Sequence, residues 1–267
     1  MQWGVGPTEV ECQGSLDVMS KDHTQQHPMT ERGRATRDRI VSCAAELVLT
    51  QGVSALSLDR IRQAASVSGS QLSHYFGDKD SLIRAVVAHQ TEVLLDFHRQ
   101  PALGNLDTFD DFEKWVDLTL NFSRRKVRSR GLPTYGALAG QLSKYDEPTR
   151  ELLADGYHQW ISLFRRGLAR MKKNGVLTEA AAPAALANVL VSAHEGGNMM
   201  TGAYGKTWPD HDALNFALAY LRQFAAHPQD RQPPTTGAAL GREVATARGH
   251  PATKFRASRR ERDFGRE

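Results

Sequence analysis

The stretch SLDRIRQAASVSGSQLSHYFGDKDSL, residues 57–82, contains two short helical patterns separated by a Ser-Val-Ser turn. Ser57 is a preferred N-cap residue for the first pattern, whose apolar residues follow at helical spacing. In the second pattern, residues 69–76, Leu72 and Phe76 are four residues apart and share one helix face, whereas most other side chains are polar. We therefore expect one face of this second helix to pack against the protein and the other to contact a polar partner.

Two short helices joined by a tight turn are typical of a helix-turn-helix, in which the second helix lies in the major groove of DNA. At its start, Gly69 allows close backbone approach, Ser70 can reach several bases and Gln71 can pair bidentately with adenine. Lys79 begins the next helix, where charge and free backbone N–H groups can bind phosphate. The residues expected to contact DNA are Thr36, Ser57, Gly69, Ser70, Gln71, Ser73, His74, Tyr75 and Lys79.

Residues 34–87, and above all the ending HYFGDK followed by Leu82, resemble the DNA-binding domain of the TetR/AcrR family of transcriptional regulators. More loosely, GLP at 131–133, ALAGQL at 137–142 and HEGG at 194–197 are similar to the LmrA/YxaF-like C-terminal subgroup. The resemblance implies a homodimeric, ligand-responsive regulator, usually a repressor that binds a palindromic operator. It also implies that the first three positions of the second helix contact bases and that the later polar positions hold the DNA backbone.

Three positions depart from the family's pattern. Ser66 stands where a turn glycine is usual, which predicts strain in a left-handed conformation. Ser73 replaces a frequent tyrosine and weakens one phosphate contact, while Arg62 replaces a small residue and can reach phosphate instead of packing. A helical small-molecule-binding or scaffold protein that has lost DNA binding therefore stays open as an alternative.

Outside this motif the 3.6-residue apolar period recurs without a convincing alternating strand, so the sequence predicts an all-α protein. We expect an N-terminal three-helix helix-turn-helix domain followed by a C-terminal helical bundle for ligand binding and dimerisation. The predicted helices cover residues 36–50, 57–65, 69–76, 78–97, 108–124, 134–142, 148–173, 183–200 and 210–226. The predicted units are a disordered extension (1–31), the DNA-binding domain with a linking helix (32–99), the bundle (105–226) and a disordered basic tail (227–267).

The bundle offers both a dimer interface and a pocket. The helix at 210–226 is apolar along two lines, more than one contact within a chain needs, so we assign a homodimer interface to residues 184–226. As a set, its aromatic residues suggest a site for an unidentified small apolar ligand, although for any single one of them a place in the core is the stronger interpretation. The candidate ligand-binding residues are Phe112, Trp115, Phe122, Leu138, Tyr157, Trp160, Phe164, His194 and Asn198.

The sequence lacks the motifs of several enzyme and nucleotide-binding classes. The segment HEGGN at 194–198 lacks the second histidine of a zinc-protease HExxH, and the chain contains no GxSxG elbow, Walker A loop or dinucleotide fingerprint. Two cysteines give neither a disulfide framework nor a metal-site spacing. We therefore expect no catalytic residues, no metal and no cofactor.

Overall composition says less about the partner than the motif does. The pI of about 9.1 indicates a basic chain, but an acidic excess in residues 1–31 offsets a basic excess in residues 227–267. No run of about 20 apolar residues is present, as a membrane span would need. We expect a soluble, cytoplasmic protein that does not enter a membrane.

Overall fold

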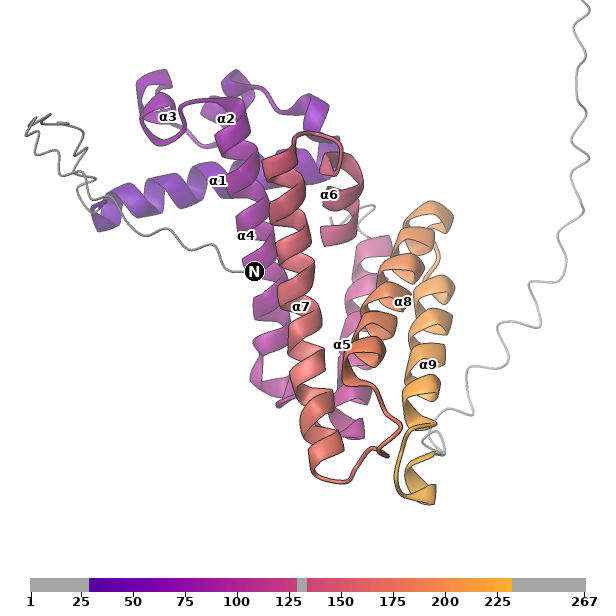
Figure 1. The fold of residues 1–267 in the computed structure, drawn as a ribbon. Coiled ribbons are helices and arrows are strands. Elements are labelled where there is room, and N and C mark those ends of the chain that lie inside the picture. Colours follow the sequence, from indigo (N-terminus) through magenta and orange to yellow (C-terminus); the bar gives the residue numbers. More distant parts are fainter. Residues whose placement is uncertain (1–28, 129–133, 232–267) are drawn as a thin grey trace, which may run out of the picture.

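The chain is described here by a computed structural model that covers residues 29–128 and 134–231 (Figure 1). Within these residues nine α-helices account for nearly all regular structure, and the all-α prediction is confirmed. The helices are α1 (Glu31–Gln51), α2 (Leu58–Ala64), α3 (Gly69–Tyr75), α4 (Lys79–Arg99), α5 (Phe109–Arg128), α6 (Tyr135–Leu142), α7 (Glu147–Lys173), α8 (Pro183–Tyr204) and α9 (Trp208–Arg222). No helix in the described part of the chain is both long and apolar enough to cross a membrane.

The first three helices and the start of α4 form a small domain at one end of the molecule (Figure 1). Its core joins Ile40 of α1, Ile61 of α2 and Leu72 of α3 to Leu82 and Val86 of α4, all of them buried. Burial of an aliphatic side chain at this level stabilises the fold by roughly 1.5–3 kcal/mol per side chain relative to exposure. The domain therefore places α3 on a packed support.

The remaining helices form a bundle in which α4 and α7 run side by side and α5, α8 and α9 lie beyond them (Figure 1). Its centre is aromatic: Phe112 and Trp115 of α5 pack with Trp160 and Phe164 of α7, and all four are fully buried. Helix α4 belongs to both units, because its first half is buried in the small domain and its second half borders the bundle. The two units are therefore joined by a continuous helix.

Several boundaries differ from the predicted ones. Helix α1 begins at Glu31, five residues before the predicted start at 36, because the Thr30 hydroxyl accepts a hydrogen bond from the backbone N–H of Gly33 and caps it. Helix α5 continues to Arg128, beyond the predicted end at 124. Residues 129–133, and residues 1–28 of the predicted N-terminal extension, lie outside the described residues.

The C-terminal boundary also moves. Helix α9 ends at Arg222, before the predicted end at 226, and a short 3-10 turn follows at Pro228–Arg231. Two side-chain bonds hold this turn: the Arg222 guanidinium donates to the carbonyl of Asp230 at 2.6 Å, and Arg231 Nε donates to the carbonyl of Ala225 at 3.1 Å. The first residues of the predicted tail are thus part of the fold, and residues 232–267 lie outside the described residues.

Candidate nucleic-acid interface and interior cavity

Helix α3 is started by a capping box. The Ser68 hydroxyl accepts from the backbone N–H of Gln71 at 3.1 Å, and Gln71 Oε1 accepts from the backbone N–H of Ser68 at 2.9 Å. This reciprocal pair satisfies two backbone donors that a helix start leaves open. The spacing of Ser and Gln three residues apart was present in the sequence, and it would have revealed the box.

The two faces expected for α3 are present. Leu72 and Phe76 are buried beneath it, at 4% and 5% exposure. The outward residues are all exposed, and they are Gly69, Ser70, Gln71, Ser73 and His74. The helix therefore presents a short polar surface backed by an apolar support, which is the arrangement a recognition helix requires.

The other residues predicted to contact DNA differ in their exposure and in their hydrogen bonds. Tyr75 is half-buried, with its ring edge-on to His74 at 5.1 Å, and Lys79 is half-buried at the first position of α4. Ser57 is exposed, but its hydroxyl caps α2 by accepting from the N–H of Arg60 at 3.3 Å. Thr36 is half-buried within α1 and donates to the carbonyl of Arg32 at 3.0 Å, so its hydroxyl already has a partner.

The turn before α3 is strained. Ser66 has a φ of 50°, in the left-handed region that favours glycine, so the strain expected from the missing glycine is present. Arg39 of α1 supports the turn by donating through Nε to the carbonyl of Ala65 at 3.0 Å. Arg62 is exposed on α2 and lies 3.6 Å from Asp59, so it does not pack inward.

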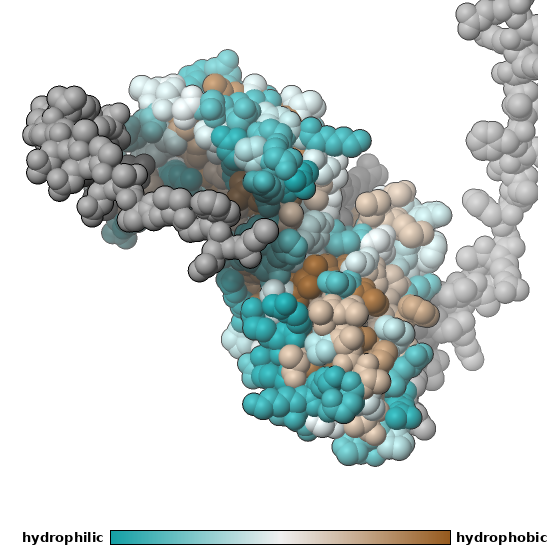
Figure 2. Space-filling model, viewed as in Figure 1, coloured by the Kyte–Doolittle hydropathy of each residue, from teal (hydrophilic) through white to brown (hydrophobic). Residues whose placement is uncertain are grey.

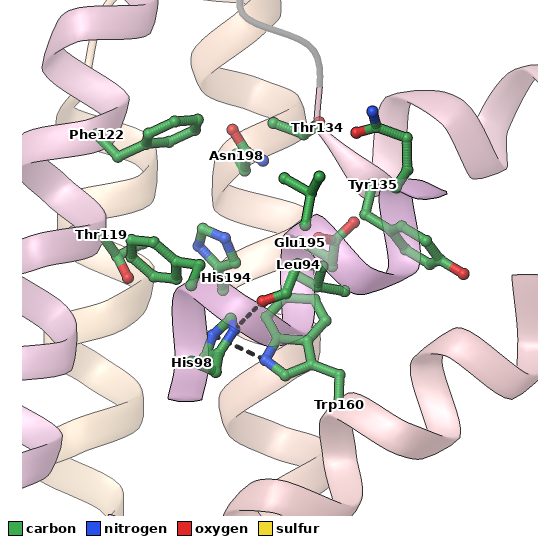
Figure 3. A pocket seen from close by; sticks show the side chains of 13 residues that line it. Leu94, His98, Thr119, Phe122, Thr134, Tyr135, Trp160, His194, Glu195 and Asn198 are labelled. Carbon is green, nitrogen blue, oxygen red and sulfur yellow. Dashed lines mark hydrogen bonds between the residues drawn. The ribbon is translucent and has the colours of Figure 1, made fainter. Parts of the chain in front are cut away.

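The bundle contains a partly open cavity of about 160 Å³ bordered by α4, α5, α6, α7 and α8 (Figure 3). Four of the nine predicted ligand-binding residues line it: Phe122, Trp160, His194 and Asn198. The other five do not line it. Phe112, Trp115, Leu138 and Phe164 are fully buried in the core, and Tyr157 is half-buried beside the cavity.

The sequence interpretation missed the largest part of the lining, which comes from α4. The sequence predicts only a linking role for this helix, but Val93, which is 49% exposed, and Phe97 both border the cavity. The signal was an apolar pattern that continues beyond the DNA-binding unit. The lining residues not predicted are Gln90, Val93, Leu94, Phe97, His98, Thr119, Thr134, Tyr135 and Glu195.

His98 lines the cavity and makes three hydrogen bonds. Its Nε2 accepts from the indole N–H of Trp160 at 2.9 Å, and its Nδ1–H donates to the carbonyl of Leu94 at 2.8 Å (Figure 3). The same Nε2 also accepts from the indole N–H of Trp115 at 3.1 Å. Burial lowers the pKa of His98 to about 4, because the charged ring would be desolvated. The ring is therefore neutral near pH 7, and its tautomer is fixed by these three bonds.

A second histidine, His194, is held by a buried carboxylate on the side away from the cavity. His194 Nδ1 lies 3.0 Å from Asp210 Oδ1, and Asp210 Oδ2 accepts from the Ser123 hydroxyl at 2.5 Å. Asp210 is fully buried near the start of α9, and its backbone N–H donates to the Thr201 hydroxyl at 3.3 Å. This cluster ties α5, α8 and α9 together and orients the His194 ring toward the cavity.

Comparison with known proteins identifies the small domain. The family model described as "Bacterial regulatory proteins, tetR family" matches residues 40–86, which run from the middle of α1 into α4 and include all of α2 and α3. The small domain therefore matches the TetR family, as the sequence resemblance predicted. The chain is accordingly a DNA-binding transcriptional regulator, with α2 and α3 as its helix-turn-helix.

Other matches extend beyond the small domain. The HTH-type transcriptional regulator YxaF of Bacillus subtilis is 25% identical over 174 residues, covering 65% of this chain and 87% of that protein. The regulator LmrA of the same organism is 27% identical over 139 residues, covering 50% of this chain and 71% of that protein. Among solved structures, a TetR regulator from Chloroflexus aurantiacus is 19% identical, covers 73% of this chain and 98% of that chain, and gives a TM-score of 0.63.

In this regulator the corner between α6 and α7 contacts the DNA-binding domain at three points. Gln141 Oε1 accepts from the backbone N–H of Val53 at 3.0 Å, Tyr145 Oη donates to Asp80 at 2.6 Å, and Arg84 meets Asp146 at 3.3 Å. The hydrogen bond to Asp80 is the main reason that the pKa of Tyr145 is raised to about 12. The cavity-lining Tyr135 begins the same α6, so the cavity and this corner share an element.

The regulator also exposes apolar side chains on its last two helices. Figure 2 shows apolar residues over α8 and the adjoining α9. Met199 and Phe216 are each 73% exposed, although large apolar side chains in a monomer are normally covered. Others on the same two helices are Val189, Met200, Tyr204, Trp208 and Tyr220.

Proposed function

We propose that this protein is a ligand-responsive repressor that binds a palindromic operator as a homodimer. One observation carries the proposal: α4 is shared between the DNA-binding domain and the cavity. Ile83 and Val87 in its first half are buried in the DNA-binding domain, whereas Leu94, Phe97 and His98 in its second half line the cavity. A ligand that favours one position of α4 in the bundle would also favour one position of the DNA-binding domain.

DNA reading is assigned to the exposed face of α3. Gly69, Ser70 and Gln71 are proposed to contact bases, and the phosphate contacts are assigned to Ser73, His74, Tyr75 and Lys79, flanked by Thr36 and Ser57. The capping box refines the role of Gln71. Because its Oε1 already accepts from Ser68, a base contact that preserves the box uses the amide NH₂ alone, as a donor to a base acceptor. Bidentate pairing with adenine would require the box to open.

The homodimer interface is assigned to α8 and α9, within residues 184–226. The exposed Met199 and Phe216 support this choice, since a second copy would cover them. A two-fold dimer of this kind would place its two α3 helices in successive major grooves, about 34–36 Å apart. That geometry is why a palindromic operator is proposed.

Release of the operator in response to ligand is assigned to motion of α4 relative to the bundle. The contacts of Asp80 with Tyr145 and of Arg84 with Asp146 support this, because they fix the start of α4 to the α6–α7 corner. The ligand is proposed to be a small, mainly apolar molecule that displaces this corner. We assign the protein no catalytic activity and place it in the cytoplasm, where its operator would lie.

Footprinting of the DNA upstream of the protein's own gene tests the proposal. Protection of a palindromic site is expected, with affinity that rises as salt falls because phosphate contacts release counterions. Gln71→Ala should abolish protection at moderate salt, whereas Gln159→Ala, an exposed glutamine on α7, should leave it unchanged. Absence of protection at every salt concentration would instead favour a protein that no longer binds DNA.

A further inference from the structure

One polar atom in the cavity lining has no protein partner. Thr119 is 3% exposed, and its Oγ1 makes no hydrogen bond to any residue that the structure describes. A buried hydroxyl without a partner destabilises the protein, so its persistence in a cavity wall is explained if a ligand supplies the bond. The threonine lies on α5 and faces the interior between α5 and α8 (Figure 3).

The second polar point is His194, which lines the same cavity from α8 (Figure 3). Its Nδ1 is engaged by the buried Asp210, which is held in turn by Ser123. The engaged Nδ1 leaves Nε2 as the ring atom that can meet a ligand. In the neutral ring Nε2 accepts a hydrogen bond, and in the protonated ring it donates one.

Charge in the cavity disfavours an anion. Among the residues that the structure describes, no lysine or arginine lines the cavity, whereas Glu195 lines it and Asp210 lies directly behind His194. The Glu195 carboxylate is itself turned toward other elements: Oε2 accepts from Tyr157 Oη at 3.0 Å and occupies the space beside Gly136 of α6. An anionic ligand would bring a further negative charge near these two carboxylates, whereas a neutral ligand adds no charge to a largely apolar site.

Size and wall chemistry define the rest of the ligand. A volume of about 160 Å³ is close to that of cavities which hold one benzene-sized ring. The walls are apolar and largely aromatic, formed by Leu94, Phe97, Phe122 and Trp160. One six-membered aromatic ring fits this space, with its edge or face against the aromatic walls.

We infer that the cavity binds a neutral, single-ring phenol, whose hydroxyl is read by Thr119 and His194. A phenolic hydroxyl both donates and accepts, so it can donate to His194 Nε2 while it accepts from Thr119 Oγ1–H. The same hydroxyl could accept from a protonated His194 and donate to Thr119. This inference names the ligand class of the proposed regulatory cavity, and in that respect it rests on the proposed function.

Calorimetric titration of the full-length protein with four related probes tests the inference. Phenol is expected to bind, and toluene, which has the same shape without the hydroxyl, is expected to bind about ten-fold more weakly. Benzoate and benzylammonium carry the same ring with opposite charges and should both bind more weakly than phenol. Equal affinity for phenol and toluene, or tighter binding of either ion, would overturn the inference.

Variants of Thr119 test whether this residue produces the preference for phenol over toluene. Thr119→Val removes the hydroxyl with little change in volume, so the preference for phenol over toluene should fall by about ten-fold while toluene still binds. Thr119→Ser should keep the preference, and Thr149→Val, at a buried threonine outside the cavity lining, should leave phenol affinity unchanged. An unchanged preference in a folded Thr119→Val protein would overturn the assignment.

The calorimetry contains no DNA, so it separates this inference from the proposed function. Phenol binding that depends on Thr119 but does not release the operator would refute ligand-responsive repression and support the cavity assignment. If another compound releases the protein from its operator and phenol does not bind, the phenol assignment is refuted, whereas the proposed regulatory function stands.

Discussion

Arg84 of α4 and Asp146, the N-cap residue of α7, lie 3.3 Å apart where the DNA-binding domain meets the helical bundle. One turn earlier on α4, Asp80 accepts a hydrogen bond from Tyr145. Both contacts join the start of α4 to the same corner of the bundle, which also carries α6. A change in the position of α4 relative to that corner must therefore stretch or replace them.

Removal of the ion pair is expected to weaken the response to ligand more than it weakens the fold. Arg84 and Asp146 are each about one-third exposed, so Arg84→Ala should change the free energy of unfolding by less than about 1 kcal/mol. The factor by which ligand lowers operator affinity should fall at least about two-fold, because α4 and the corner move more independently. Fluorescence anisotropy with labelled operator, with and without ligand, measures this factor.

Two variants control this prediction. Asp146→Asn removes the charge and keeps an acceptor for the cap, so its effect should match that of Arg84→Ala, and the two should not add. Arg99→Ala breaks exposed ion pairs with Glu92 and Asp96 at the other end of α4 and should leave the ligand effect unchanged. An equal loss in Arg99→Ala would show that the junction has no special role.

The left-handed turn residue provides a stability prediction. Ser66 has a φ of 50°, and a glycine there avoids the steric cost of a side chain. Ser66→Gly should raise the free energy of unfolding by about 0.5–1 kcal/mol, which urea denaturation can measure. The matched change Ser70→Gly, inside α3, should lower it by a few tenths of a kcal/mol because glycine is a poorer helix former. Destabilisation by Ser66→Gly would mean that its side chain contributes a contact outweighing the strain.

Two variants of Gln71 distinguish its role in capping α3 from its proposed role in base reading. Gln71→Glu keeps an oxygen that can accept from the Ser68 N–H, so the stability of the DNA-binding domain should remain within about 0.5 kcal/mol. It removes the amide donor and places a negative charge beside the duplex, so operator affinity should fall more than ten-fold. Gln71→Ala should lose both properties, with a stability cost of about 0.5–1 kcal/mol. Anisotropy and thermal denaturation together distinguish the two effects.

Local features of the fold could be predicted from the sequence, because they depend on residues close in the chain. The four-residue spacing of Leu72 and Phe76 predicted the packed face of α3, and Ser57 marked the start of α2 as its N-cap. The strain at Ser66 was also foreseeable, since it follows from the local backbone alone.

The cavity could be predicted only in part, because it depends on how distant helices meet. Helical periodicity distinguishes an inward face from an outward one, but it does not distinguish core residues from cavity walls. Trp115 and Trp160 look alike in sequence, yet only Trp160 borders the cavity while Trp115 is enclosed by the core. Thr119 carries no sequence signal at all, since its importance lies in a bond that the rest of the bundle does not provide.

The apolar face of α8 and α9 predicts how the protein assembles. Phe216 is 73% exposed, so Phe216→Glu should cost little in a monomer but should place a charge in the proposed interface. Sedimentation velocity should show mainly monomer, and operator affinity should fall at least ten-fold because one half-site is lost. Leu58→Glu, an exposed apolar residue of the DNA-binding domain, is the control that should remain dimeric. A dimeric Phe216→Glu protein would place the interface elsewhere.

Acid should loosen the bundle through His98. Burial lowers its pKa from 6.5 to about 4, so between these values the unfolded chain binds a proton that the folded protein excludes. The contribution of the neutral ring is complete above pH 6.5 and is lost as pH falls toward 4, by an amount of order 3 kcal/mol. Urea denaturation should show the stability gap between wild type and His98→Gln narrowing across this range. His158→Gln, at an exposed position of α7, should show no such narrowing, and a constant gap for His98→Gln would contradict the neutral, twice-bonded ring.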